Sequence, residues 1–163
     1  MSGTDWLGLG GKTVLVTGLK NRKSVAWHAA KQLEEVGAHV AFVVHSEERR
    51  EEVSKLTGDR PVFVCDVRDA EQIARLGREV ADALPSVDGL VHSIAFANYS
   101  DGWKPFHETN VEDFLEATNV SAFSLVALAN ALKDSFSPDA SVVTISISTT
   151  TMAAENYGYM API

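Results

Sequence analysis

The chain has 163 residues, 45% of them hydrophobic and 22% charged, and a formal net charge of −8 at pH 7. This length suits a single domain with a substantial core, because a chain of this size buries about two thirds of its unfolded surface. The acidic balance argues against nucleic acid or an anionic membrane as partner, and a single cysteine, Cys65, excludes an internal disulfide and fits a reducing compartment. We find no export signal and no segment of membrane-spanning length, and we expect a cytoplasmic location.

Short apolar runs alternate with helical stretches along the chain. The apolar runs predict five strands, at residues 13–17, 40–44, 62–65, 89–94 and 142–147. Apolar spacing predicts helices at 24–37, 47–56, 70–84 and 111–133, the last weakly interrupted near Asn119. Strands that are apolar throughout and separated by helices indicate a parallel sheet covered on both faces. We therefore predict an α/β, Rossmann-like doubly wound parallel sheet, truncated after the fifth strand, in one domain over residues 1–163.

The first strand meets the first helix through Gly18 and a polar loop, residues 19–23. The unpaired N–H groups at such a helix start form an anion site that dinucleotide pyrophosphates commonly occupy. The usual three-glycine fingerprint is absent, because Arg22 and Ser24 stand where its later glycines would fall. The turn by itself leaves two interpretations open, a pyrophosphate site and an ordinary strand–turn–helix capped by Ser24.

Ligands of doubly wound sheets bind at the carboxyl ends of the strands, so the residues that follow each run are the candidates for binding. These residues are Gly18 to Ser24, His45, Asp66 with Val67, Ser93 to Ala95, and the stretch after Ile147. Asp66 is placed to accept a hydrogen bond from an adenine amino group, to cap the following helix, or to do both. His45 stands where NAD-binding folds place a ribose-binding acid, and a solvated helix start is favoured over a 2′-phosphate ligand for Arg49.

Four segments of the chain resemble the enoyl-acyl-carrier-protein reductases of bacterial fatty-acid synthesis, a divergent branch of the short-chain dehydrogenase/reductases. The segments are TGLKNRKSVAW at 17–27, CDV at 65–67, DGLVHSIAFA at 88–97 and NYGYM at 156–160. Gly18, Ser24 and Ala26 match the Gly-x5-Ser-x-Ala pattern of that branch, and VHSIAFA replaces the Asn-Asn-Ala-Gly of ordinary short-chain dehydrogenases. The resemblance covers nearly the whole chain, from about Leu9 to the last residue.

The resemblance implies that NADH reduces a trans-2-enoyl thioester carried on acyl carrier protein, in a homotetramer whose interface includes the helix from Val111. Tyr157, preferred over Tyr159, would donate a hydrogen bond to the enolate oxygen as negative charge develops there. The residues implied in cofactor binding are Gly18, Ser24, Val25, His45, Asp66, Val67, Ser93, Ile94 and Ala95. No metal site is implied, and His28 and His92 are assigned to packing.

The chain departs from the family pattern around the tyrosine. The family lysine lies seven residues after the tyrosine, and position 164 is one beyond Ile163; Ala161 excludes the ordinary Tyr-x3-Lys pattern. Ile147 stands where many members carry a second tyrosine. We therefore expect an N-terminal fragment with little or no turnover.

Two other functions remain open from the sequence. An ordinary short-chain dehydrogenase or ketoreductase predicts Tyr-x3-Lys and Asn-Asn-Ala-Gly, neither of which is present. A non-catalytic dinucleotide-binding or assembly module is favoured by the missing lysine. Asn119 matches the asparagine that supports a proton relay in ordinary short-chain dehydrogenases, and a satisfied polar kink is an equal alternative. The preference for NADH over NADPH and the acyl-chain length are not determined by these residues.

Overall fold

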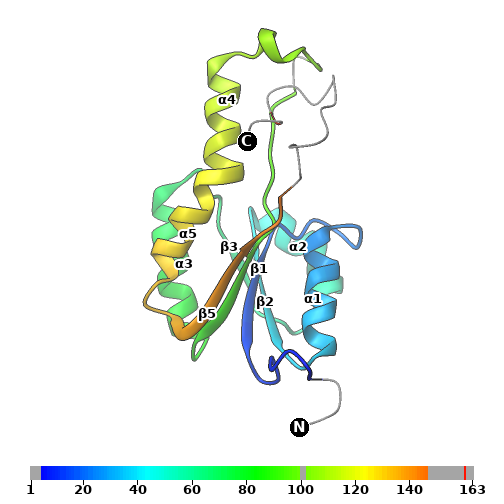
Figure 1. The fold of residues 1–163 in the computed structure, drawn as a ribbon, viewed down its shortest axis with the longest axis vertical. Helices are drawn as coiled ribbons and strands as arrows, with labels where there is room; N and C mark the ends of the chain where they lie inside the picture. The colour runs from blue at the N-terminus through cyan, green and yellow to red at the C-terminus, as the bar shows by residue number, and fades with distance from the viewer. Residues whose placement is uncertain (1–4, 100–101, 147–159, 161–163) are drawn as a thin grey trace.

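The computed structural model of the protein describes residues 5–99, 102–146 and 160. Within them, five parallel strands form one sheet in the order β3-β2-β1-β4-β5 (Figure 1). The strands are β1 Thr13–Thr17, β2 His39–Val44, β3 Val62–Val64, β4 Val87–His92 and β5 Phe136–Thr144. The helices are α1 Val25–Glu35, α2 Glu47–Thr57, α3 Ala70–Ala83, α4 Val111–Thr118 and α5 Ser124–Leu132, with a 3-10 turn, η1, at Phe106–Glu108 and a π-helical turn, η2, at Asn119–Phe123. This is the doubly wound fold predicted, and its strand order reverses between β1 and β4.

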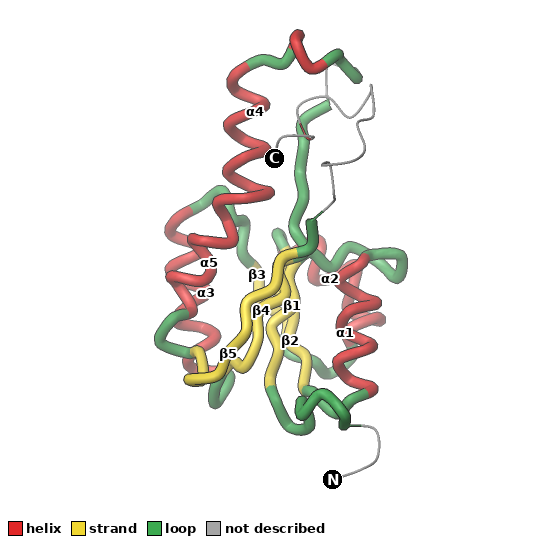
Figure 2. Tube along the Cα trace, viewed as in Figure 1, coloured by secondary structure: helices red, strands yellow, loops and turns green. Residues whose placement is uncertain are grey.

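The helices cover both faces of the sheet, with α1 and α2 on one face and α3 and α5 on the other (Figures 1 and 2). Alternate side chains of β1 divide between two cores, because successive residues of a strand point to opposite faces. Leu15 packs in the cluster that includes Leu76 of α3 and Leu128 of α5, whereas Val14 and Val16 pack in the cluster that includes Ala26, Ala30 and Val53. The apolar strands are therefore buried on both sides, as their sequence predicts.

Hydrogen bonds of nearby residues explain where α1 ends and where α3 begins. The α1 helix ends before Gly37, whose φ of +92° permits the hydrogen bond from the Ala38 N–H to the Leu33 carbonyl at 3.0 Å. The α3 helix begins after Asp69, whose carboxylate accepts hydrogen bonds from the N–H groups of Glu71 and Gln72. The capping role considered for Asp66 is therefore wrong, because Asp69 fills it.

The second and third strands differ from their predicted bounds by one residue, and the fourth and fifth differ by more. The fourth strand begins at Val87 and ends at His92, and the fifth begins at Phe136, where the sequence pattern Ser-Pro-Asp gives no strand signal. Backbone pairing decides both bounds: Val87 pairs with Phe136, and the register then shifts before Gly89 pairs with Ser141. The irregular pairing lets polar residues continue a strand that hydrophobic patterning alone would start later.

The helices α4 and α5 form one 22-residue helical run with η2 at its centre, so the predicted interruption near Asn119 is confirmed. By length and composition alone, with a mean hydropathy of 1.3 over an 18-residue window, this run is long and apolar enough to cross a membrane, and the expectation that no segment reaches that length is wrong. Its α5 half packs on α3 so closely that a Cβ on Gly77 would lie 2.4 Å from the Ala131 carbonyl oxygen. The α4 half extends beyond the carboxyl edge of the sheet (Figure 1).

Candidate functional site

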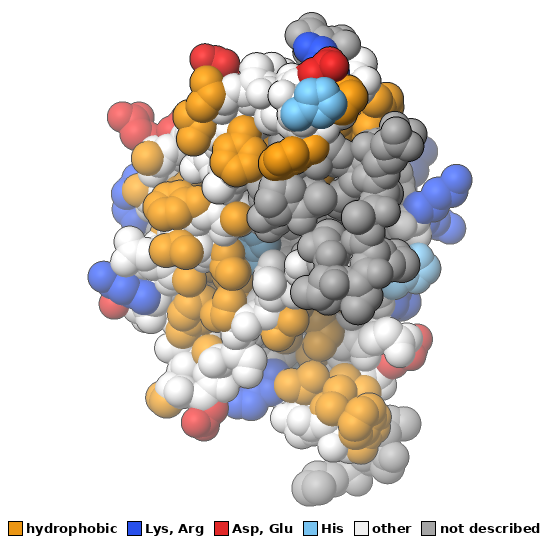
Figure 3. All heavy atoms as spheres, turned by 45° about the horizontal axis from the view of Figure 1, so that its top comes forward, with side chains coloured by type: hydrophobic (Ala, Val, Ile, Leu, Met, Phe, Trp, Pro, Cys, Tyr) orange, Lys and Arg blue, Asp and Glu red, His pale blue; other side chains and the backbone are white. Residues whose placement is uncertain are grey.

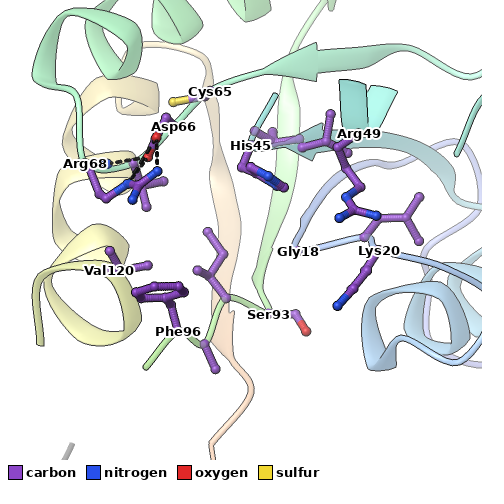
Figure 4. Close-up of a pocket in the computed structure, with 16 residues that line it drawn as sticks. Gly18, Lys20, His45, Arg49, Cys65, Asp66, Arg68, Ser93, Phe96 and Val120 are labelled. Carbon is purple, nitrogen blue, oxygen red and sulfur yellow. Dashed lines mark hydrogen bonds and ion pairs between the residues drawn. The ribbon is translucent and has the colours of Figure 1, made fainter. Parts of the chain in front are cut away.

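A pocket of about 390 Å³ lies at the carboxyl ends of the strands, next to the point where the strand order reverses. Seven of the nine residues predicted to bind cofactor line it: Gly18, His45, Asp66, Val67, Ser93, Ile94 and Ala95. They come from four strand ends that are far apart in sequence. Figure 4 shows Asp66 with Arg68 on one side of this pocket, and His45, Arg49 and Lys20 on the other. The parallel sheet thus brings the predicted residues together in one cavity.

At Gly18, the backbone that follows β1 lies against the backbone that follows β4. The φ of Gly18 is +81°, and a Cβ at this position would lie 1.8 Å from the Ser93 carbonyl oxygen. The adjoining Thr17 hydroxyl accepts a hydrogen bond from the Ser93 N–H at 3.0 Å and donates to the Val91 carbonyl at 3.3 Å. Only glycine fits such a close approach of two backbones, and Gly18 itself lines the pocket.

The Ser24 hydroxyl does not cap α1. It accepts hydrogen bonds from the N–H groups of Lys20 at 3.0 Å and Asn21 at 2.9 Å, and so it folds the loop that precedes the helix. No side chain in the described ranges caps α1, and the Trp27 N–H donates to the Ser24 carbonyl at 3.0 Å, so the N–H groups of Val25 and Ala26 are the ones that an anion could use. The simple capped-helix interpretation of this turn is therefore wrong. Ser24 and Val25 lie outside the pocket lining, and the Val25 side chain is 54% exposed.

At the end of β3, the Asp66 carboxylate is held by Arg68. The Arg68 Nη2 lies 2.6 Å from Oδ2, and its Nε and backbone N–H each donate to Oδ1 at 3.0 Å. These hydrogen bonds from Arg68 hold the pKa of Asp66 below its ordinary value. The Asp66 N–H donates to the Gln72 side-chain oxygen at 3.0 Å, and Val67 is buried beside it. An ionised acceptor thus stands next to an apolar wall.

At the end of β2, the exposed His45 precedes the α2 cap. The Ser46 hydroxyl accepts the Arg49 N–H at 3.2 Å, so Arg49 lies in the first turn of α2 as expected. The Arg49 guanidinium pairs with Glu52 while also lining the pocket. A cation is therefore present on this wall, and an acid on the same helix already neutralises it.

The segment after β4 is anchored to the π-helical turn. The Phe96 N–H donates to the Ser121 hydroxyl at 3.0 Å, and the same hydroxyl donates to the Phe96 carbonyl at 3.0 Å. A turn of the π type inserts an extra residue into a helix and often marks a functional site. Here η2 turns Ser121 toward the pocket segment, whereas Asn119 is exposed at the first position of that turn.

Behind this segment lies a buried polar network centred on His92, which has no exposed surface. The Ser124 hydroxyl donates to the Val120 carbonyl at 2.7 Å, so the contact between His92 Nε2 and Ser124 Oγ at 2.7 Å assigns the Nε2 proton to the imidazole. His92 Nδ1 then accepts from the Thr144 hydroxyl at 3.3 Å. Burial lowers the pKa of His92. The packing role predicted for His92 is confirmed, and that predicted for His28 is wrong because His28 is exposed.

Among the pocket residues that sequence reasoning missed are Arg68 and Phe96, whereas Lys20 lies within the predicted stretch from Gly18 to Ser24. A cation two residues after Asp66 was the signal that could have identified Arg68. Tyr157, Tyr159 and Ile147, on which the predicted chemistry depends, lie outside the described residues. In the ranges that the structure describes, no three His, Cys, Asp or Glu side chains are placed to hold a metal ion together.

Comparison with known proteins relates the chain to one family of enzymes. A family model described as "Enoyl-(Acyl carrier protein) reductase" matches residues 18–163. The enoyl-[acyl-carrier-protein] reductase [NADH] of Enterococcus faecalis is 32% identical over 150 residues, which are 91% of this chain and 60% of that protein. The enoyl-[acyl-carrier-protein] reductase [NADPH] of Staphylococcus aureus is 31% identical over 159 residues, 94% of this chain and 62% of the relative.

The fold agrees with a solved structure of the same kind. The crystal structure of the enoyl-[acyl-carrier-protein] reductase (NADH) from Aquifex aeolicus superposes with a TM-score of 0.87 at 30% identity, covering 94% of this chain and 62% of the other. The chain thus spans about 60% of the length of the curated relatives it matches. Because the family model covers residues 18–163, from the glycine turn to the last residue, the chain belongs to the enoyl-(acyl carrier protein) reductase family.

Proposed function

We propose that this protein reduces trans-2-enoyl thioesters of acyl carrier protein with NADH, and that residues 1–163 form its dinucleotide-binding domain. One observation carries the proposal: four strand ends bring Gly18, His45, Asp66 and the Ser93–Ala95 segment to one pocket at the switch point of a doubly wound sheet. Family membership supports the reaction, because the relatives bear that activity in their names.

The described residues fit a dinucleotide. The ionised Asp66 carboxylate can accept a hydrogen bond from an adenine amino group, and Val67 offers the ring an apolar surface. The first N–H groups of α1, which no side chain caps, can hold a pyrophosphate beside the pocket, and Lys20, from the preceding loop, adds a positive charge to the pocket lining. The Ser93–Ala95 segment would support the nicotinamide end.

When bound, NADH supplies a hydride to the β-carbon of the enoyl thioester. We assign the phenol of Tyr157 to the thioester oxygen, where it would donate a hydrogen bond as negative charge builds. Such a donor in a site that excludes water contributes about 3 kcal/mol to the stabilisation of the transition state. The Gly18–Ser93 contact and the Ser121–Phe96 hydrogen bonds hold the pocket segment in place for that step.

We propose NADH over NADPH because of the charged residues that follow β2. The first turn of α2 carries two acids, Glu47 and Glu48, and Glu52 engages the Arg49 guanidinium. A 2′-phosphate placed here would meet these acids and would have to displace Glu52 from Arg49. Isothermal titration of the chain with each dinucleotide tests this: we expect NADH to bind at least about tenfold more tightly, and equal affinity would contradict the assignment.

One assay, run with two different thioesters, tests whether the chain reduces a substrate or only binds the dinucleotide. The chain is incubated with NADH and crotonyl thioester, and NADH oxidation is followed by absorbance; an acetoacetyl thioester serves as the matched ketoreductase substrate. No lysine occurs among residues 134–163, so we expect little or no oxidation, and any oxidation should need the enoyl substrate and disappear in Tyr157→Phe. Oxidation driven by the acetoacetyl thioester would instead indicate an ordinary ketoreductase. Tight NADH binding without oxidation by either thioester would favour the non-catalytic dinucleotide-binding module.

We further propose that the protein works in the cytoplasm as a homo-oligomer, a tetramer by analogy with the family. The single cysteine, Cys65, is a free thiol buried in the sheet, which suits a reducing compartment. Apolar side chains gather over α4 and α5 (Figure 3), where Val111, Leu115, Phe123 and Val126 are each 56–60% exposed. An exposed apolar surface of this kind is typical of a subunit interface.

A further inference from the structure

Arg68 connects two parts of the pocket that are far apart in sequence. It lies in the loop between β3 and α3, and its side chain turns back over Asp66 (Figure 4). Its Nη1 lies 3.3 Å from Glu116 Oε1 on α4. The guanidinium therefore bridges an acid at the strand end and an acid on the helix that extends past the sheet.

The bridge fixes the direction of the Asp66 carboxylate. The guanidinium binds both carboxylate oxygens, with Nη2 at 2.6 Å from Oδ2 and Nε at 3.0 Å from Oδ1 and 3.1 Å from Oδ2. A guanidinium is planar and its N–H groups have a fixed fork geometry, so two-point contact restricts rotation of the carboxylate. The two oxygens offer about four acceptor positions, and Arg68 engages them with three donor groups, its backbone N–H, Nε and Nη2, so about one position is left for a ligand in the pocket that Asp66 lines.

A carboxylate that is ionised and held in one direction can only accept hydrogen bonds. An amino group on the six-membered ring of a purine can donate to it. A carbonyl oxygen at the same ring position would face it as a second acceptor, and the unpaired polar groups would weaken binding.

We propose that Arg68 is a positioning residue that makes this pocket select a 6-amino purine, adenine, over a 6-oxo purine, hypoxanthine, by holding the Asp66 carboxylate as a fixed acceptor. The inference rests on the proposed function, because it concerns the base end of the same dinucleotide site. Arg68 acts through Asp66 and does not itself read the base.

The test compares NADH with reduced nicotinamide hypoxanthine dinucleotide, in which a 6-oxo group and an N1–H replace the 6-amino group and unprotonated N1 of adenine. Binding is measured by isothermal titration of the 163-residue chain at pH 7.5. For the unchanged chain we expect NADH to bind about tenfold more tightly. Arg68→Met keeps an apolar stem without donors, and its preference for NADH should fall at least about fivefold. Arg68→Lys, a cation without the planar fork, should restore the preference only in part.

Two control variants show whether the effect is specific. Arg75→Met removes the same charge from α3, where Arg75 pairs with Glu79, and should keep the full preference. Asp66→Asn places an amide, which can donate as well as accept a hydrogen bond, at the edge of the base. This variant should abolish the preference for NADH. Circular dichroism and thermal unfolding of each variant show that the fold persists.

The outcomes distinguish the inference from the function on which it rests. If the unchanged chain binds neither dinucleotide, the proposed function itself is wrong. Equal binding of both dinucleotides, or an Arg68→Met variant that keeps the preference while Asp66→Asn loses it, would overturn the role of Arg68 alone. Tighter NADH binding by Arg68→Met would also overturn it, because Arg68 would then be blocking Asp66.

Discussion

At the scale of single residues, the pocket depends most on a position without a side chain. Gly18 has a positive φ, and any Cβ there would overlap the Ser93 carbonyl, 1.8 Å away. Gly58, which ends α2, also has a positive φ, but a Cβ there would meet open space. Substitutions at the two glycines therefore distinguish two costs in folding free energy, that of an unfavourable backbone conformation and that of steric overlap.

We predict that Gly58→Ala lowers the free energy of unfolding by about 2 kcal/mol, because a residue with a Cβ rarely adopts the φ of 58° and ψ of −132° found there. Gly18→Ala should lower it by at least about 3 kcal/mol, because strand ends must also move apart, and NADH binding should be lost. Urea unfolding and calorimetric titration measure both effects. Equal stability of the two variants would show that the β1 and β4 ends are not in contact.

At the scale of elements, β4 is joined to α5 and β5 through a neutral imidazole. His92 donates to Ser124 and accepts from Thr144, and burial lowers its pKa. In the unfolded chain the imidazole takes up a proton near pH 6.5, whereas in the folded protein it stays neutral to lower pH. The unfolded state therefore binds more protons in this window, and acid favours unfolding.

The free energy of unfolding should accordingly fall as the pH is lowered through 6.5. We expect a smaller fall in His92→Gln, whose amide can still donate to Ser124 but does not titrate. His28→Gln serves as the control, because this histidine is exposed and its replacement should leave the slope unchanged. Urea unfolding at pH 7.5 and 5.5 measures both slopes. Identical slopes in His92→Gln and the unchanged chain would remove His92 as the cause.

At the scale of the whole molecule, the α4–α5 run is covered only in part. Its α5 half packs on α3, whereas Val111, Leu115, Phe123 and Val126 expose apolar surface to solvent. Burial of apolar surface is the main driving force of association, so this side of the molecule should meet another copy of the chain.

Replacement of Leu115 and Val126 by Glu should convert a self-associating chain into a monomer, because burying two charges opposes association. Light scattering coupled to size exclusion measures the mass. Glu at Ala74 and Ala81, two exposed positions of α3, adds the same charge elsewhere and should leave association intact. A monodisperse monomer of the unchanged chain would contradict the proposed interface.

Much of this architecture follows from the sequence alone. Apolar runs and helical spacing predict the parallel strands, both helix layers and the interruption near Asn119, because burial on both faces of a sheet leaves a direct hydrophobic pattern. The strand-end rule also names Gly18, Asp66 and Ser93 as neighbours, since parallel strands share one carboxyl edge.

Only the tertiary structure decided which partner each polar side chain takes. Ser24 folds its own loop instead of capping α1, Asp69 replaces Asp66 as the α3 cap, and Arg68 reaches both Asp66 and Glu116. Local spacing cannot predict these choices, because several donors compete for each acceptor and differences of about 1 kcal/mol decide among them. The polar start of β5 likewise depended on pairing with β4, a contact made across 49 residues of sequence.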